Sequence, residues 1–127
     1  MDTSPRVLLW GFSREEQNRI QQFLMELNAP PAVMIERKQG HLKVHDILFT
    51  DLRAEDEFAS DEKVMLFFNV QADSIKGIMQ AFKNMDIPRP IFAMVTQQSI
   101  DWKFSYLVEH LVEERDFIQR RRQEEMH

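Results

Sequence analysis

The chain of 127 residues contains no cysteine and only three glycines. Without cysteine it can form no disulfide, no thiolate metal ligand and no thiol nucleophile. Gly11, Gly40 and Gly77 are too far apart for a glycine-rich phosphate loop or a dinucleotide-binding fingerprint, and no glycine-serine-glycine nucleophile elbow is present. These absences exclude thiol chemistry and the most readily recognised nucleotide-binding and hydrolase motifs.

Long hydrophobic runs are also missing. No apolar stretch approaches the ~20 residues of a membrane span, and the first six residues lack the basic and apolar stretches of a secretory signal. We therefore expect a cytoplasmic protein without a membrane partner. The net charge of -5 disfavours nucleic-acid binding, which depends on lysine and arginine. With 43% hydrophobic residues, the chain should fold as a single domain over 1–127.

The first third of the chain has the pattern of a strand, a helix and a second strand. The apolar run 7–10 predicts a buried strand, and Ser13 with Glu16 forms a capping-box pattern that predicts a helix start. Pro30 and Pro31 end the helix, and residues 32–35 predict the second strand. Helical spacing places four apolar residues on the inward face: Ile20, Phe23, Leu24 and Leu27.

The same pattern returns after residue 63. Residues 64–68 and 91–95 predict two more strands. The inward stripe of the helix between them should contain five apolar residues: Ile75, Ile78, Met79, Phe82 and Met85. We interpret the chain as an internal duplication, with a pseudo-repeat over 6–50 and 63–122 joined by an acidic linker, 51–62, which we expect to be solvated and mobile.

Each half carries a trailing segment. Residues 39–49 fit either a short helix or an extra strand, whereas Trp102, Phe104 and Leu107 open the apolar stripe of a long C-terminal helix with Ser99 or Asp101 as its N-cap. The predicted fold is an α/β (α+β) sandwich with four strands from two β-α-β halves. The sheet is either mixed or ferredoxin-like. Because the strands are apolar on both faces, we expect cover on both sides, from helices of the chain or from a second subunit.

The stretch from Val64 to Phe117 resembles a known family. Its features are a strand ending in Met94-Val95-Thr96, followed by Trp102 and an acidic, leucine-containing helix. These features are similar to those of the prokaryotic family called domain of unknown function 3783. The resemblance implies a compact α/β domain and no assigned reaction. It makes Thr96 and Trp102 candidate binding residues, although Trp102 also fits an anchor of the last helix on the sheet.

Three polar clusters are candidates for chemistry. His41 and His45 are four residues apart, so on a helix they would share a face and could hold a metal ion together with Asp46 or Asp51. The alternative is that both are ordinary surface histidines. His110 precedes Glu113 and Glu114, a pattern that fits an acid-base group or the wet face of a helix.

The third cluster, Arg120 to Arg122, could bind phosphate or an acidic partner, but cations are also favoured at a helix C-terminus. We therefore predict no catalytic residue, no metal site and no cofactor. The first hypothesis is a non-catalytic binding or regulatory module for a protein or small ligand, and it includes a possible homodimer. The alternatives are a small metal-dependent enzyme using His41 and His45, and nucleic-acid binding through Arg120 to Arg122.

Overall fold

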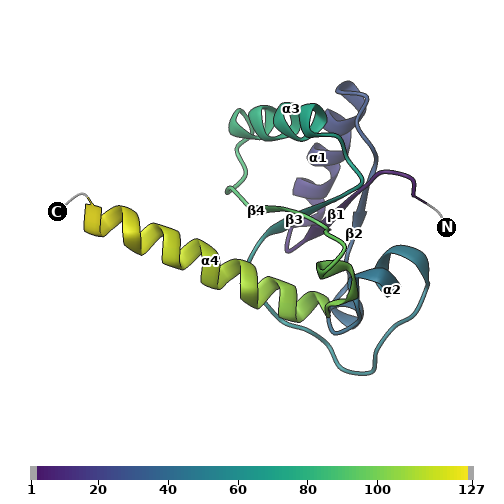
Figure 1. The fold of residues 1–127 in the computed structure, drawn as a ribbon. Helices are drawn as coiled ribbons and strands as arrows, with labels where there is room; N and C mark the ends of the chain where they lie inside the picture. Colours follow the sequence, from purple (N-terminus) through teal and green to yellow (C-terminus); the bar gives the residue numbers. More distant parts are fainter. Residues whose placement is uncertain (1–2, 126–127) are drawn as a thin grey trace.

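The computed structural model describes residues 3–125, which form a three-layer α/β/α sandwich around one four-stranded sheet (Figure 1). The strands lie in the order β2-β1-β3-β4. Strands β1 and β2 are parallel, β3 and β4 are parallel, and the central strands β1 and β3 are antiparallel. The sheet is therefore mixed, and the ferredoxin-like alternative does not apply because each β-α-β half pairs its own two strands side by side.

The elements follow the predicted order and add two short 3-10 helices. In chain order they are β1 (Arg6–Trp10), α1 (Arg14–Glu26), β2 (Ala32–Met34), η1 (Arg37–Gln39), α2 (Val44–Phe49), β3 (Val64–Phe68), α3 (Ala72–Lys83), β4 (Ile91–Met94), η2 (Ser99–Asp101) and α4 (Phe104–Glu125).

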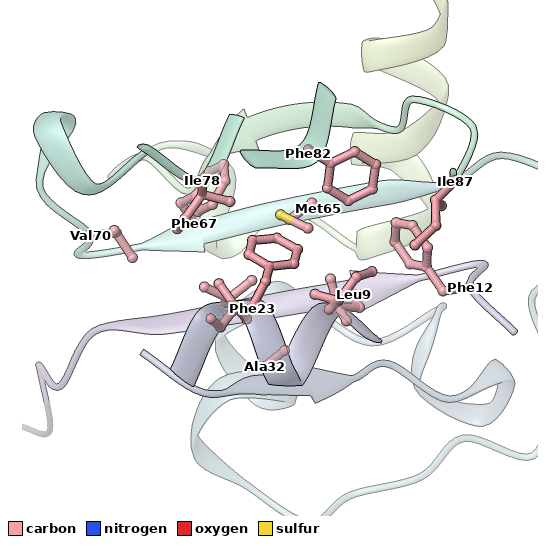
Figure 2. Packing of buried hydrophobic residues seen from close by; sticks show 13 residues of the cluster. Leu9, Phe12, Phe23, Ala32, Met65, Phe67, Val70, Ile78, Phe82 and Ile87 are labelled. Atoms are coloured by element: carbon pink, nitrogen blue, oxygen red, sulfur yellow. The ribbon is translucent and has the colours of Figure 1, made fainter. Parts of the chain in front are cut away.

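Helices α1 and α3 cover one face of the sheet. Alternate residues of the two central strands, among them Leu9 and Phe67, pack against Ile20 of α1 and both Ile78 and Phe82 of α3 (Figure 2). All five side chains are buried, so the apolar stripes that the sequence predicts for these helices do face the sheet.

Helices α2 and α4 cover the opposite face. Leu8 and Trp10 of β1 contact a second cluster that includes Val44 of α2 and both Phe104 and Leu107 of α4. Cover on both faces explains why the strands are apolar at successive positions. The side-chain Nε1 of Trp10 is the one buried side-chain nitrogen or oxygen in residues 3–125 without a hydrogen-bond partner.

The two halves share unusual local features at matching places. Each first strand is followed by a residue with positive φ, Gly11 at 85° and Asn69 at 56°. Gly11 is required there because a Cβ would lie 2.2 Å from the carbonyl oxygen of Glu62. The last helices of the two halves also begin side by side, where Lys43 and Lys103 form an antiparallel bridge.

Two local predictions need correction, and the structure decides between the two alternatives left open for residues 39–49. Leu27 caps the end of α1 and is exposed, because the helix stops before Leu27 can turn inward. Residues 39–49 contain the short helix α2 and no extra strand. Ser99 and Asp101 lie in η2, and Trp102 precedes α4, which begins only at Phe104, so neither Ser99 nor Asp101 caps the long helix.

The acidic linker, 51–62, has no helix or strand, yet it is anchored near its middle. Phe58 packs its ring against Trp10 at 5.1 Å and Phe104 at 6.1 Å between centroids. The backbone nitrogen of Phe58 donates to the carbonyl oxygen of Arg37. The Phe58 side chain fills the space beside Gly40, because a Cβ atom on Gly40 would lie only 2.3 Å from the Cβ of Phe58. One aromatic residue therefore ties the linker to the second core cluster.

None of the helices within residues 3–125 is long and apolar enough to cross a membrane.

Candidate interaction surface

Thr96 follows β4 and forms a reciprocal pair with Ser99. The Thr96 backbone nitrogen donates to the Ser99 hydroxyl at 2.9 Å, and the Ser99 backbone nitrogen donates to the Thr96 hydroxyl at 2.9 Å. The first half has a similar arrangement around η1, where Glu36 and Gln39 cap each other. The hydroxyl of Thr96 is thus engaged in holding the turn between β4 and η2, and its role as a binding residue stays a prediction.

Trp102 connects the two halves. Its carbonyl oxygen accepts a hydrogen bond from the backbone nitrogen of Val44, and the carbonyl of Leu42 accepts one from Phe104. The half-buried indole meets the rings of Tyr106 at 4.9 Å and His110 at 5.3 Å, both nearly perpendicular. This geometry supports the interpretation that Trp102 anchors the start of α4, while its exposed edge leaves the binding prediction open.

His41 and His45 have separate partners. The His41 Nδ1 atom lies 3.2 Å from the Ser105 hydroxyl, whereas the His45 Nδ1 atom lies 3.5 Å from a carboxylate oxygen of Asp46. His41 precedes α2, so the two rings are not successive turns of one helix. Within residues 3–125 no group of three histidine or acidic side chains is arranged to hold a metal ion.

The polar groups on α4 are paired on its wet face. His110 Nε2 lies 3.0 Å from Glu114, and both side chains are partly exposed. At the far end, the Arg121 guanidinium lies over the ring of Phe117 at 5.9 Å, and Arg120 donates to the backbone carbonyl of Asp116. Neither cluster surrounds an enclosed site with a nucleophile, and both fit the surface interpretation.

The two edges of the sheet differ in whether a side chain of the chain pairs with the backbone of the edge strand. At the β2 edge, the side-chain amide of Gln21 accepts a hydrogen bond from the Ala32 nitrogen at 3.0 Å and donates one to the Ala32 carbonyl. A glutamine amide that both donates and accepts in this way imitates a neighbouring strand. The β2 edge is therefore partly closed by the chain itself.

The β4 edge has an apolar side chain at the matching place. Gln21 comes eight residues after Ser13, the N-cap of α1, and Met79 comes eight residues after Gln71, the N-cap of α3. A methionine side chain cannot pair with backbone groups as an amide does. Because Ile91 and Val95 donate toward β3, the alternation of a strand directs the backbone groups of Phe92 and Met94 away from the sheet.

A groove of about 730 Å³ runs beside this edge, between β4 and α4. Both apolar side chains and charged side chains, three arginines and one glutamate, line it. The lining includes Met79, Arg89, Ile91, Leu111, Glu114 and Ile118. Met94 does not line the groove and is 58% exposed.

Helix α4 passes the β4 edge and projects away from the sheet (Figure 1). The last contact that fixes it is an ion pair in which Arg115 donates to both carboxylate oxygens of Glu62 at 2.6 and 3.0 Å. Hydrogen bonding to Glu62 raises the pKa of the Arg115 guanidinium. From Asp116 to Glu125 every residue is exposed, including Phe117 at 55% and Ile118 at 51%.

Sequence reasoning missed the open β4 edge. It selected Thr96 and Trp102, which lie just beyond the C-terminal end of β4, but not Met79, Phe92 or Met94. The sequence does contain one relevant difference: Gln21 and Met79 lie at equal distances from the starts of their helices, but only Gln21 can pair with a backbone. This difference matters only once β2 and β4 are known to be the edge strands.

The fold and this surface define a small three-layer α/β domain with one open sheet edge and a projecting helix. Residues 63–118 match the model of a family described as Domain of unknown function (DUF3783), which confirms the resemblance seen in the sequence. The match runs from residue 63, next to β3, into α4, so it contains β4 and the groove-lining residues up to Ile118. No curated protein and no solved structure matches the chain.

Proposed function

We propose that this chain is a non-catalytic binding module that recognises a protein through the β4 edge and α4. The carrying observation is the combination of outward-directed backbone groups on β4 with the groove of apolar and charged side chains beside them. Exposed strand edges bind other strands through main-chain hydrogen bonds, and adjacent pockets accept the side chains. The exposed Phe117 and Ile118 extend the same surface along the projecting helix.

The alternatives have weaker support. A metal-dependent enzyme would require His41 and His45 to converge, but they have different partners. Nucleic-acid binding would require a concentrated positive patch, yet Asp116, Glu124 and Glu125 lie near Arg120 to Arg122. The binding module requires no feature beyond those of the β4 edge and α4.

Site-specific crosslinking tests the proposal. A photoreactive phenylalanine analogue is placed at Met94 or at Ile118 of the full chain, with Met25 as the control because it is 77% exposed on α1, away from the groove. The chain is then irradiated in a lysate of its source cells. We expect discrete adducts from the first two positions and none from Met25, and an excess of unlabelled wild-type chain should suppress those formed with a different protein.

An excess of the Met79→Gln variant should fail to suppress the same adducts, because the glutamine amide would occupy the β4 edge as Gln21 occupies the β2 edge. Equal labelling at all three positions, or no adduct at Met94 and Ile118, would contradict the proposed function.

The binding module is also proposed to derive from one duplicated β-α-β-α unit. Support comes from the matching positive-φ residues Gly11 and Asn69, the paired helix starts at Lys43 and Lys103, and a family match confined to one half. In this interpretation α2 is the shortened equivalent of α4. Relatives of residues 6–50 that fail to align with relatives of residues 63–122 would contradict the duplication.

A further inference from the structure

We infer that the partner at the β4 edge is a second copy of this chain. This inference rests on the proposed function. The two β4 strands pair antiparallel across a twofold axis and join two four-stranded sheets into one of eight strands. Each α4 then lies under the sheet of the other copy, and the two helices run antiparallel beside each other.

The backbone of β4 suits pairing with itself. Only residues 92 and 94 direct their backbone groups outward, and an antiparallel pair centred on Ala93 brings Phe92 of each copy opposite Met94 of the other. Each such pair exchanges two hydrogen bonds. The two alanines meet at the axis, where the strands approach most closely, and their small side chains leave room for that approach. Met94, exposed in the single chain, becomes covered by the second copy.

The length of the α4 projection favours a whole sheet over a single peptide strand. The exposed segment from Asp116 to Glu125 is ten residues, or about 15 Å of helix. Adjacent strands are ~4.8 Å apart, so the projection extends across about three further strands. A bound peptide would fill only the first of these positions. Ile118, which lines the groove, would face the underside of the second sheet.

The charges of α4 are complementary to those of an antiparallel copy. Three and four residues before Phe117 are Glu114 and Glu113, and three and four residues after it are Arg120 and Arg121. If two helices cross antiparallel at Phe117, each acidic pair lies opposite the basic pair of the other copy. A parallel arrangement would place like charges together, so the charge order selects the antiparallel one.

The proposed interface combines the contact between the two β4 strands with the contact between the two α4 helices. A four-residue strand is only about 13 Å long and is too small to hold two chains alone, because specific interfaces bury roughly 800 Å² on each partner. The twofold axis doubles every contact, and the helix contact adds to the strand contact. The β2 edge is less suited to this pairing, because Gln21 already engages the outward backbone groups of Ala32.

Sedimentation equilibrium of the full chain between about 1 and 100 μM tests the inference. We expect the wild-type chain to approach twice its monomer mass in this range. Met94→Lys should weaken the dimer at least about ten-fold, because a charge on an edge strand opposes pairing. Val33→Lys is the matched control, since Val33 is similarly exposed on the β2 edge, and it should leave the dimer unchanged.

Charge exchange tests the helix contact. The double variant Glu113→Arg with Glu114→Arg should weaken the dimer, and adding Arg120→Glu with Arg121→Glu should restore it, because the complementary order is then rebuilt in reverse. Circular dichroism of each variant establishes that the fold is retained. A strict monomer at every concentration overturns the inference, as does a dimer insensitive to Met94→Lys or one that the four-fold exchange does not restore.

The crosslinking experiment separates this inference from the proposed function. Adducts of two copies of this chain support both. Adducts with a different protein, together with a monomeric chain in sedimentation, overturn the second-copy inference and leave the binding module standing. The absence of adducts at both Met94 and Ile118 would contradict the binding module itself.

Discussion

Replacing Gln21 with methionine would reproduce at the β2 edge the side chain that Met79 supplies at the β4 edge. Methionine and glutamine have similar lengths and helix propensities, so the change removes mainly the two hydrogen bonds with Ala32. Each such bond contributes about 0.5–1.5 kcal/mol net. Because both groups are only partly buried and water can replace the amide, we expect a loss of about 1–2 kcal/mol in the free energy of unfolding.

Urea unfolding followed by circular dichroism measures this loss. With a slope of about 2 kcal/mol per molar urea, within the usual range for a small domain, the midpoint should fall by roughly 0.5–1 M without a change in slope. Gln22→Met is the matched control, since Gln22 is the next residue of α1 and is exposed. If Gln21→Met and Gln22→Met unfold at the same urea concentration as the wild type, the amide does not stabilise the β2 edge and the contrast between the two edges loses its basis.

Three further changes test the local structure. Gly77→Ala should stabilise the chain by about 0.5–1 kcal/mol, because Gly77 lies inside α3 with open space around its Cα. Gly11→Ala should instead destabilise the chain by at least about 1 kcal/mol, because Gly11 has a positive φ. Thermal unfolding of the two variants checks both signs. Thr96→Ala should cost about 1 kcal/mol in urea unfolding by removing the turn hydroxyl, while Thr96→Ser should cost less; an unchanged stability would assign Thr96 to binding instead. Burial would raise the pKa of Glu16, but hydrogen bonds from Lys63 and from the Ser13 backbone outweigh it and hold the pKa below its usual value of 4.5. The stabilisation by Glu16 should therefore be complete above pH ~4.5 and disappear as the pH falls through the lowered pKa, so that wild type and Glu16→Gln converge in acid; a stability difference independent of pH would refute this.

The candidate site was only partly predictable. The sequence identified the neighbourhood of the C-terminal end of β4 through Thr96 and Trp102, and the family resemblance there is confirmed over residues 63–118. It also predicted the long C-terminal helix, which runs on to Phe117 and Ile118, both exposed. It did not identify Met79, Phe92 or Met94, because the importance of these residues depends on which strand lies at an open edge.

Local physical chemistry explains what the sequence determined by itself. The capping box of Ser13 and Glu16 forms as predicted, since it needs only residues three apart, and the stripes that contain Ile20 and Phe82 are buried because helical spacing fixes which side chains share a face. Apolar strands on both faces likewise required cover on both sides of the sheet.

Only the tertiary structure decided the order of the strands, the anchoring of the linker by Phe58 and the difference between the two sheet edges. Each of these depends on contacts between residues far apart in the chain, such as Val7 with Phe67 or Phe58 with Trp10. Periodicity reports which side of an element is apolar, but it contains no information about which other element will lie there. That choice, made by the packing of the whole domain, partly closes the β2 edge with Gln21 and leaves the backbone of β4 without such a side chain.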